Sequence, residues 1–157
     1  GRVMPQRLLL NRWVGAPIVA LAGVGAFYLG GTLVDSVPPV EYEHAEALAP
    51  EVAQGGTISV GFTVNRTRLC ETLPVRRILT DADGIQHVVP TFTVGFPNTI
   101  GRDSYVRQIT VPESAAVGHA EYQVRLRYAC NWWQRVSGFV IEVNSPPIGF
   151  RILPRSP

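Results

Sequence analysis

The sequence predicts a mainly β protein, with one N-terminal transmembrane helix followed by an immunoglobulin-like antiparallel β-sandwich. Three observations predict this fold class. Residues 13–34 carry no charge and are long enough to cross a bilayer. From residue 57 onward, apolar and polar residues alternate in short runs, with turn residues about every ten positions. Two cysteines lie 60 positions apart in this second part, which agrees with one bridge in a sandwich.

The charges are unevenly distributed along the 157 residues, although the net charge is only +2. All 14 basic residues are arginines. The net charge is +3 before Trp13, −5 from there to Glu51, and +4 from Val52 onward. The hydrophobic fraction of 46% excludes disorder as the main state, and two cysteines exclude a disulfide-rich mini-scaffold.

The uncharged stretch 13–34 is predicted to be a transmembrane helix, because 22 helical residues span about 33 Å. Three arginines precede it and four acidic residues follow it: Arg2, Arg7 and Arg12, then Asp35, Glu41, Glu43 and Glu46. The positive-inside rule therefore places residues 1–12 in the cytoplasm and the C-terminal domain outside it, periplasmic or virion-associated. A secretory signal peptide is the alternative; the length of the stretch favours an uncleaved signal-anchor.

Small residues recur every four positions within this helix, at Ala22, Ala26 and Gly30. Such a spacing puts them on one face, where another membrane helix can approach closely. The alternative is that small residues are simply frequent in this segment.

Residues 35–51 are predicted to be an acidic linker rich in proline and alanine. Pro38 and Pro39 cannot continue a helix, and a short helical turn is expected from Glu41 to Leu48. The domain boundaries are thus 1–12, 13–34, 35–51 and 52–157, the last being the β-sandwich.

The sandwich domain is predicted to contain seven or eight short strands. The clearest has Tyr122, Val124, Leu126 and Tyr128 on one face, with polar residues between them. A hairpin is expected around Asp81-Ala82-Asp83-Gly84, whose glycine can take a positive φ. The predicted strands lie near residues 57–64, 75–80, 85–89, 92–94, 105–111, 121–130, 139–143 and 150–153.

Cys70 and Cys130 are expected to form a disulfide, because both lie at strand ends and outside the cytoplasm. Two buried free thiols are the alternative. No catalytic motif is recognisable: the three histidines are far apart, and Asp81-x-Asp83-Gly84 lacks the remaining ligands of a calcium loop. The sequence therefore predicts no enzyme, no metal and no cofactor.

Arginines and tryptophans form the candidate interaction surface. Arg66, Arg68, Arg76, Arg77, Arg125 and Arg127 are predicted to form a basic sheet face, with Trp132 and Trp133 beside it. Arginine with aromatic residues is enriched at protein–protein hot spots and also holds single-stranded nucleic acid. A solvated outer face is the plain alternative.

Several of these features together resemble small single-pass proteins encoded by tailed phages and prophages of GC-rich bacteria. The resemblance rests on the Arg-flanked anchor, on Pro38-Pro39-Val40, and on Tyr122-x-Val124-x-Leu126-x-Tyr128-x-Cys130-Asn131. It implies a phage or bacterial-envelope setting and no catalytic residues.

The predicted function is a non-enzymatic, membrane-anchored structural or interaction subunit of an envelope or virion assembly. Its expected partners are membrane lipid and other protein subunits, and nucleic acid is disfavoured. The alternative function is an adhesin-like accessory module that binds a soluble ligand or nucleic acid.

Overall fold

A computed structural model describes residues 7–33, 35–91 and 99–156. The chain divides into two compact units, residues 1–36 and 37–157. The first contains helix α1 (Arg7–Leu33), 27 residues long. Its segment Trp13–Gly31 is long and apolar enough to cross a membrane, with a mean hydropathy of 1.7. The helix begins before the uncharged stretch, so Pro17 lies in its interior and not in its first turn, as membrane helices tolerate.

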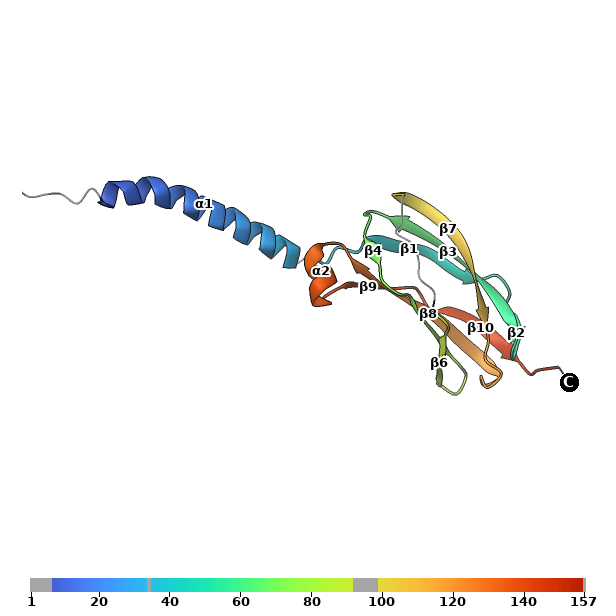
Figure 1. Cartoon of the computed structure of the whole chain (residues 1–157). Coiled ribbons are helices and arrows are strands. Elements are labelled where there is room, and N and C mark those ends of the chain that lie inside the picture. The colour runs from blue at the N-terminus through green and yellow to red at the C-terminus, as the bar shows by residue number, and fades with distance from the viewer. Residues whose placement is uncertain (1–6, 34, 92–98, 157) are drawn as a thin grey trace, which may run out of the picture. The chain divides into compact units, whose positions relative to one another are not determined.

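The second unit is an immunoglobulin-like β-sandwich of two sheets (Figure 1). The smaller sheet has the order β1-β3-β7, and all its strands are antiparallel. Its strands are β1 (Val40–Ala47), β3 (Thr57–Arg66) and β7 (Gly101–Thr110).

The larger sheet has the order β2-β10-β8-β5-β6, and the short strands β4 and β9 also pair with β8. Strands β2 and β10 are parallel, in contrast to the other pairs. The strands are β2 (Glu51–Ala53), β4 (Glu71–Thr72), β5 (Arg76–Thr80), β6 (Gln86–Val89), β8 (Gly118–Ala129), β9 (Ile141–Asn144) and β10 (Ile148–Leu153), with helix α2 (Trp132–Ser137) between β8 and β9.

The core lies between the two sheets and comes from the alternating strands. The apolar face of β3 supplies Ile58, Val60, Phe62 and Val64, all buried. Strand β8 supplies Tyr122, Val124, Leu126 and Tyr128 from the opposite sheet. The period-two prediction for both strands is therefore confirmed, as is the hairpin between β5 and β6, where Gly84 has a φ of 78°. The strand expected near residues 92–94 lies outside the described residues.

The prediction of a linker over residues 35–51, between the apolar helix and the sandwich, is wrong over much of its length. Residues 40–47 form β1, paired with β3, and not a helical turn from Glu41 to Leu48. The register shifts between Tyr42 and His44, so Tyr42 and Ala45 both face the core although they are three positions apart. This bulge conceals the period of two. Glu41, Glu43 and Glu46, which were expected on the linker, lie on the exposed side of β1, an edge strand of the smaller sheet.

Candidate interaction surfaces

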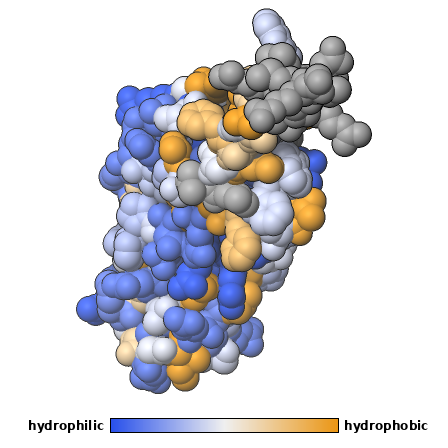
Figure 2. All heavy atoms as spheres, turned by 90° about the vertical axis from the view of Figure 1, so that its left-hand side faces the viewer, coloured by the Kyte–Doolittle hydropathy of each residue, from blue (hydrophilic) through white to orange (hydrophobic). Residues whose placement is uncertain are grey.

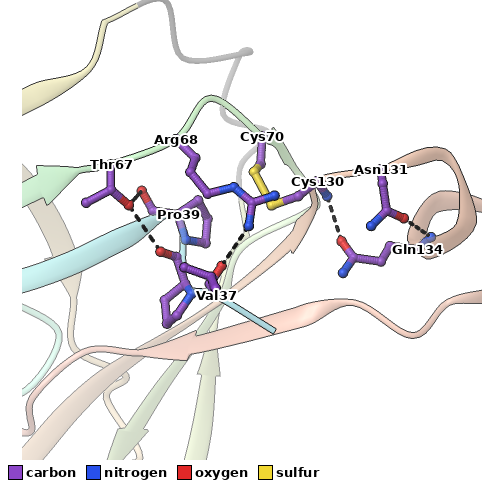
Figure 3. The surroundings of a disulfide bond; sticks show 9 residues. Val37, Pro39, Thr67, Arg68, Cys70, Cys130, Asn131 and Gln134 are labelled. Carbon is purple, nitrogen blue, oxygen red and sulfur yellow. Dashed lines mark hydrogen bonds between the residues drawn. A yellow bond between two sulfur atoms is a disulfide. The ribbon is translucent and has the colours of Figure 1, made fainter. Parts of the chain in front are cut away.

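The Cys70–Cys130 disulfide joins the ends of two strands of the domain, and its presence confirms the prediction. Cys70 follows β3 by four residues, and Cys130 directly follows β8. Figure 3 shows that the chain enters the domain beside this bridge. The Arg68 guanidinium donates to the Val37 carbonyl (Nη1–O, 3.3 Å), and the Thr67 backbone N–H donates to the Pro39 carbonyl (2.9 Å). Two loops and the first residues of the domain are thus held together at one end.

The six-residue helix α2 begins immediately after the bridge, where an irregular loop was expected. Asn131 caps it, because its Oδ1 accepts from the Gln134 N–H (2.9 Å). The Gln134 side chain reaches back to accept from the Cys130 N–H (2.7 Å). Gly138 ends the helix with a φ of 78°. The sequence Asn131-x-x-Gln134 is a capping-box signal, which the prediction of a loop missed.

Trp132 and Trp133 lie at the start of α2, with ring centroids 5.9 Å apart in an edge-to-face arrangement. Trp132 is exposed and Trp133 is half-buried. Trp132 also lines a surface hollow of about 220 Å³ together with Leu69 and Arg135. Of the two tryptophans in the candidate interaction surface, Trp132 is therefore the more accessible one.

The six arginines expected on one sheet face are divided between different parts of the domain. Arg66 is on β3 of the smaller sheet, where its Nη1 donates to Asp103 on β7 (2.7 Å). That hydrogen bond holds the pKa of the Asp103 carboxyl below its usual range. Arg68 lies in the loop after β3, beside the disulfide. The remaining four belong to β5 and β8 of the larger sheet. The prediction of a single basic face is therefore wrong.

One of these four, Arg77, is buried and bridges the two sheets. Its Nε donates to the Tyr122 hydroxyl (2.7 Å), and its Nη2 donates to the Gln108 carbonyl on β7 (2.7 Å). Its Nη1 reaches the Pro90 carbonyl (3.2 Å). A residual hollow of about 60 Å³ lies beside it in the interior. Arg77 alternates with Val75 and Leu79, both fully buried, and this period of two puts Arg77 on the inner face of β5, although it was expected on the basic face.

The other three of these four arginines, Arg76, Arg125 and Arg127, surround one open groove. The groove has a volume of about 290 Å³ and is also lined by Pro74 and Glu142. Arg76 and Arg125 lie directly opposite each other on β5 and β8, an arrangement that is destabilising for like charges. Within the described parts of the chain, none of the three forms an ion pair, and the Nε of Arg125 is buried without a partner. We call these three residues the arginine groove.

The small residues Ala22, Ala26 and Gly30 lie on α1, and a Cβ added at Gly30 would have open space around it among the described residues. Packing of this stripe against a second helix stays a prediction. Among the described residues, no group of three metal-ligating side chains is close enough to hold a metal ion.

A buried carboxylate ties the hairpin between β5 and β6 to the loop before β8. Asp81 Oδ1 accepts from the N–H groups of Asp83 and Ile85 (both 3.0 Å). Its Oδ2 accepts from the Ala116 N–H (3.1 Å) and contacts His87 Nε2 (2.7 Å). The His87 ring and these backbone donors lower the pKa of Asp81 from 3.8 to about 2. The sequence pattern suggested only a turn here.

This lowered pKa predicts an acid-sensitive contact. The unfolded chain protonates Asp81 near its ordinary pKa, so the stabilisation is complete above about pH 4 and is lost as the pH falls toward 2. We expect the urea midpoint of Asp81→Asn to lie below that of the wild type at pH 7 and to change less between pH 4 and pH 2. Asp83→Asn, in the same turn but exposed, serves as the control. Equal acid dependence of Asp81→Asn and wild type would contradict this prediction.

The comparisons with known proteins concern the fold only. No family profile and no curated protein sequence matches the chain. Among solved structures, the alkylpurine DNA glycosylase AlkC of Pseudomonas fluorescens is similar over 73% of this chain and 30% of its own, with 14% identity and a TM-score of 0.44. An immunoglobulin-like protein of Pseudomonas aeruginosa is similar over 74% and 94%, with 14% identity and a TM-score of 0.29.

The sporulation control protein Spo0M of Bacillus subtilis is similar over 77% of this chain and 51% of its own, with 12% identity and a TM-score of 0.35. The chain spans less than a third of the glycosylase. By its own elements, the chain is a mainly β protein with an apolar N-terminal helix and a two-sheet β-sandwich that carries one disulfide.

Proposed function

We propose that this protein is a non-enzymatic, membrane-anchored interaction subunit, whose β-sandwich is presented outside the cytoplasm within an envelope or virion assembly. The apolar helix α1 supports anchoring, since its Trp13–Gly31 segment matches the thickness of a bilayer. Arginines before the helix and acidic residues after it support a cytoplasmic N-terminus. The disulfide supports an oxidising compartment for the domain.

The observation that carries an interaction role is the arginine groove. Three guanidinium groups face one open hollow without an ion pair in the described chain, and two of them are cross-strand neighbours. Such an arrangement is stabilised when an anionic group lies between the arginines, because guanidinium groups bind carboxylates in a bidentate geometry. The proposed occupant is an acidic segment of a neighbouring protein subunit.

A nucleic-acid ligand is the alternative, and the geometry favours it less. Binding of single strands combines a basic groove with aromatic side chains on which bases stack. The arginine groove contains no aromatic side chain among its described lining residues. The exposed Trp132 lines a different hollow, beside the disulfide.

The test measures binding of a fluorescent deca-glutamate peptide to the full chain in phosphatidylcholine nanodiscs. We expect Arg125→Gln to weaken this binding by about tenfold or more, since a hydrogen bond to a charged group contributes about 1.5–3 kcal/mol. Arg151→Gln is the matched control, because Arg151 is exposed on β10 of the same sheet but outside the groove. If Arg125→Gln and Arg151→Gln weaken peptide binding equally, the arginine groove is not the binding site. Tighter binding of a single-stranded oligonucleotide than of the peptide would favour the alternative.

Anchoring is tested separately, by alkaline carbonate extraction and by protease protection in intact cells. We expect the full chain to stay with the membrane after extraction. We also expect the domain to be digested only by protease that is added from the outer side. Release by carbonate would contradict the anchor, and protection of the domain would contradict its orientation.

A further inference from the structure

The end of the domain that carries the disulfide is also the end at which the chain enters it. The Thr67 hydroxyl donates to the Pro38 carbonyl (3.3 Å), and Arg68 holds Val37. On the other side of the bridge, Cys130 is hydrogen-bonded to Gln134 of α2 (Figure 3). Val37 and α2 are therefore fixed to the same end of the sandwich.

The length of chain before Val37 limits how far this end can lie from the apolar helix. Helix α1 ends at Leu33, and only three residues separate Leu33 from Val37. Fully extended, this connection spans at most about 14 Å. The opposite end of the domain is far from it, because the 12-residue strand β8 alone is about 40 Å long.

The surface of this end is apolar where it carries α2. Trp132 and Val136 lie one turn apart on the same side of the helix and are 51% and 76% exposed. Phe139, just beyond the helix, is 75% exposed, and Leu69, which shares a hollow with Trp132, is 40% exposed. The face of the molecule in Figure 2 shows mostly hydrophilic residues with hydrophobic patches between them. We call Leu69, Trp132, Val136 and Phe139 the apolar tip.

Basic side chains accompany the apolar tip. Arg135 belongs to α2 and also contacts Glu71 (Nε–Oε2, 2.7 Å), while its side chain stays 65% exposed. Arg68 lies next to Leu69 in the sequence. Tryptophan beside arginine is the composition that membrane–water interfaces favour, because the indole ring takes the boundary position and arginine reaches the phosphates.

We infer that the apolar tip lies in the headgroup region of the same bilayer that holds α1, so that the domain has two points of attachment to the membrane. This inference rests on the proposed membrane anchor. The occupant of the tip is lipid, because the short connection after α1 keeps this end near the surface. A second copy of the chain and a partner protein are the other occupants that the test distinguishes.

The test uses tryptophan quenching in the full chain, reconstituted into phosphatidylcholine vesicles with acyl chains brominated near the headgroup. A variant with Trp13→Phe and Trp133→Phe keeps Trp132 as its single tryptophan. In the control, all three tryptophans are replaced by phenylalanine and Ile85→Trp is added. Ile85 is exposed and lies in the turn between β5 and β6, to which Asp81 binds Ala116. Ala116 lies two residues before the start of β8, so this turn is at the end of the domain opposite the disulfide.

We expect Trp132 to lose emission in brominated vesicles relative to unbrominated ones, and Ile85→Trp to keep its emission. Adding Val136→Asp to the Trp132 variant is expected to reduce the quenching, because a carboxylate at the interface opposes burial of the tip. Val88→Asp, at an exposed position on the edge strand β6, is expected to leave the quenching unchanged.

Each remaining outcome overturns the inference in a recognisable way. If Trp132 is not quenched although the chain floats with the vesicles after a carbonate wash, the contact between the apolar tip and lipid is contradicted. The proposed membrane anchor is then still supported. Trp132 emission that shifts only with the protein density in the vesicles assigns the tip to a second copy. A chain that does not float with the vesicles removes the proposed anchor itself.

Discussion

Removal of the disulfide is expected to lower the free energy of unfolding of the domain by about 4 kcal/mol, because the bridge closes a long loop in the unfolded chain. Cys70 and Cys130 are 60 positions apart, and Cys70 is buried. Substituting alanine at both positions avoids placing a serine hydroxyl in the interior. The measurement is urea unfolding of residues 37–157, which contain the whole described core.

A reductant provides the matched control for this prediction. Dithiothreitol is expected to shift the wild-type urea midpoint toward that of the double alanine variant and to leave the variant itself unchanged. The bridge also joins the loop after β3 to the start of α2, so reduction is expected to change the fluorescence of Trp132. Identical midpoints of oxidised and reduced wild type would contradict the prediction.

Much of the sandwich could be predicted because its strands bury one face only. Strand β8 alternates without interruption from Tyr122 to Tyr128, so its inner face is evident from the sequence alone. Strand β1 was missed because its bulge at Tyr42 and His44 breaks the period. Its half-buried Ala45 and Ala47 also give a weak apolar signal. Local patterns thus identify regular strands and miss those whose pairing is irregular.

The candidate surfaces depended on information that a single strand does not contain. The pairing of Arg76 with Arg125 follows from the register between β5 and β8, which alternation alone leaves open by steps of two residues. The start of helix α2, by contrast, could have been predicted from the sequence, because Asn131 and Gln134 have the spacing of an N-terminal capping box. Arg66 lies on the smaller sheet, whereas the arginines of β5 and β8 lie on the larger one, a division that only the topology could reveal.

The buried Arg77 is expected to be the most sensitive polar residue of the core. Arg77→Ala should lower the free energy of unfolding of residues 37–157 by about 3 kcal/mol, because it removes a charged interior donor and its described hydrogen bonds to Tyr122, Pro90 and Gln108. Two of these bonds reach carbonyls outside the larger sheet's β5–β8 pair, one of them on β7. The substitution therefore loosens the contact between sheets as well as the local packing.

The neighbouring residue supplies a control with the opposite expectation. Arg76→Ala removes a charge of the same kind from the same strand, but from its exposed side, where Arg125 lies opposite. Relief of this like-charge pair should leave the urea midpoint unchanged or slightly raised. Arg77→Met is expected to fall between the two, since it keeps the apolar stem and loses the donors. Equal destabilisation by Arg76→Ala and Arg77→Ala would contradict the inward placement of Arg77, and with it the division of arginines between a structural interior and an open groove.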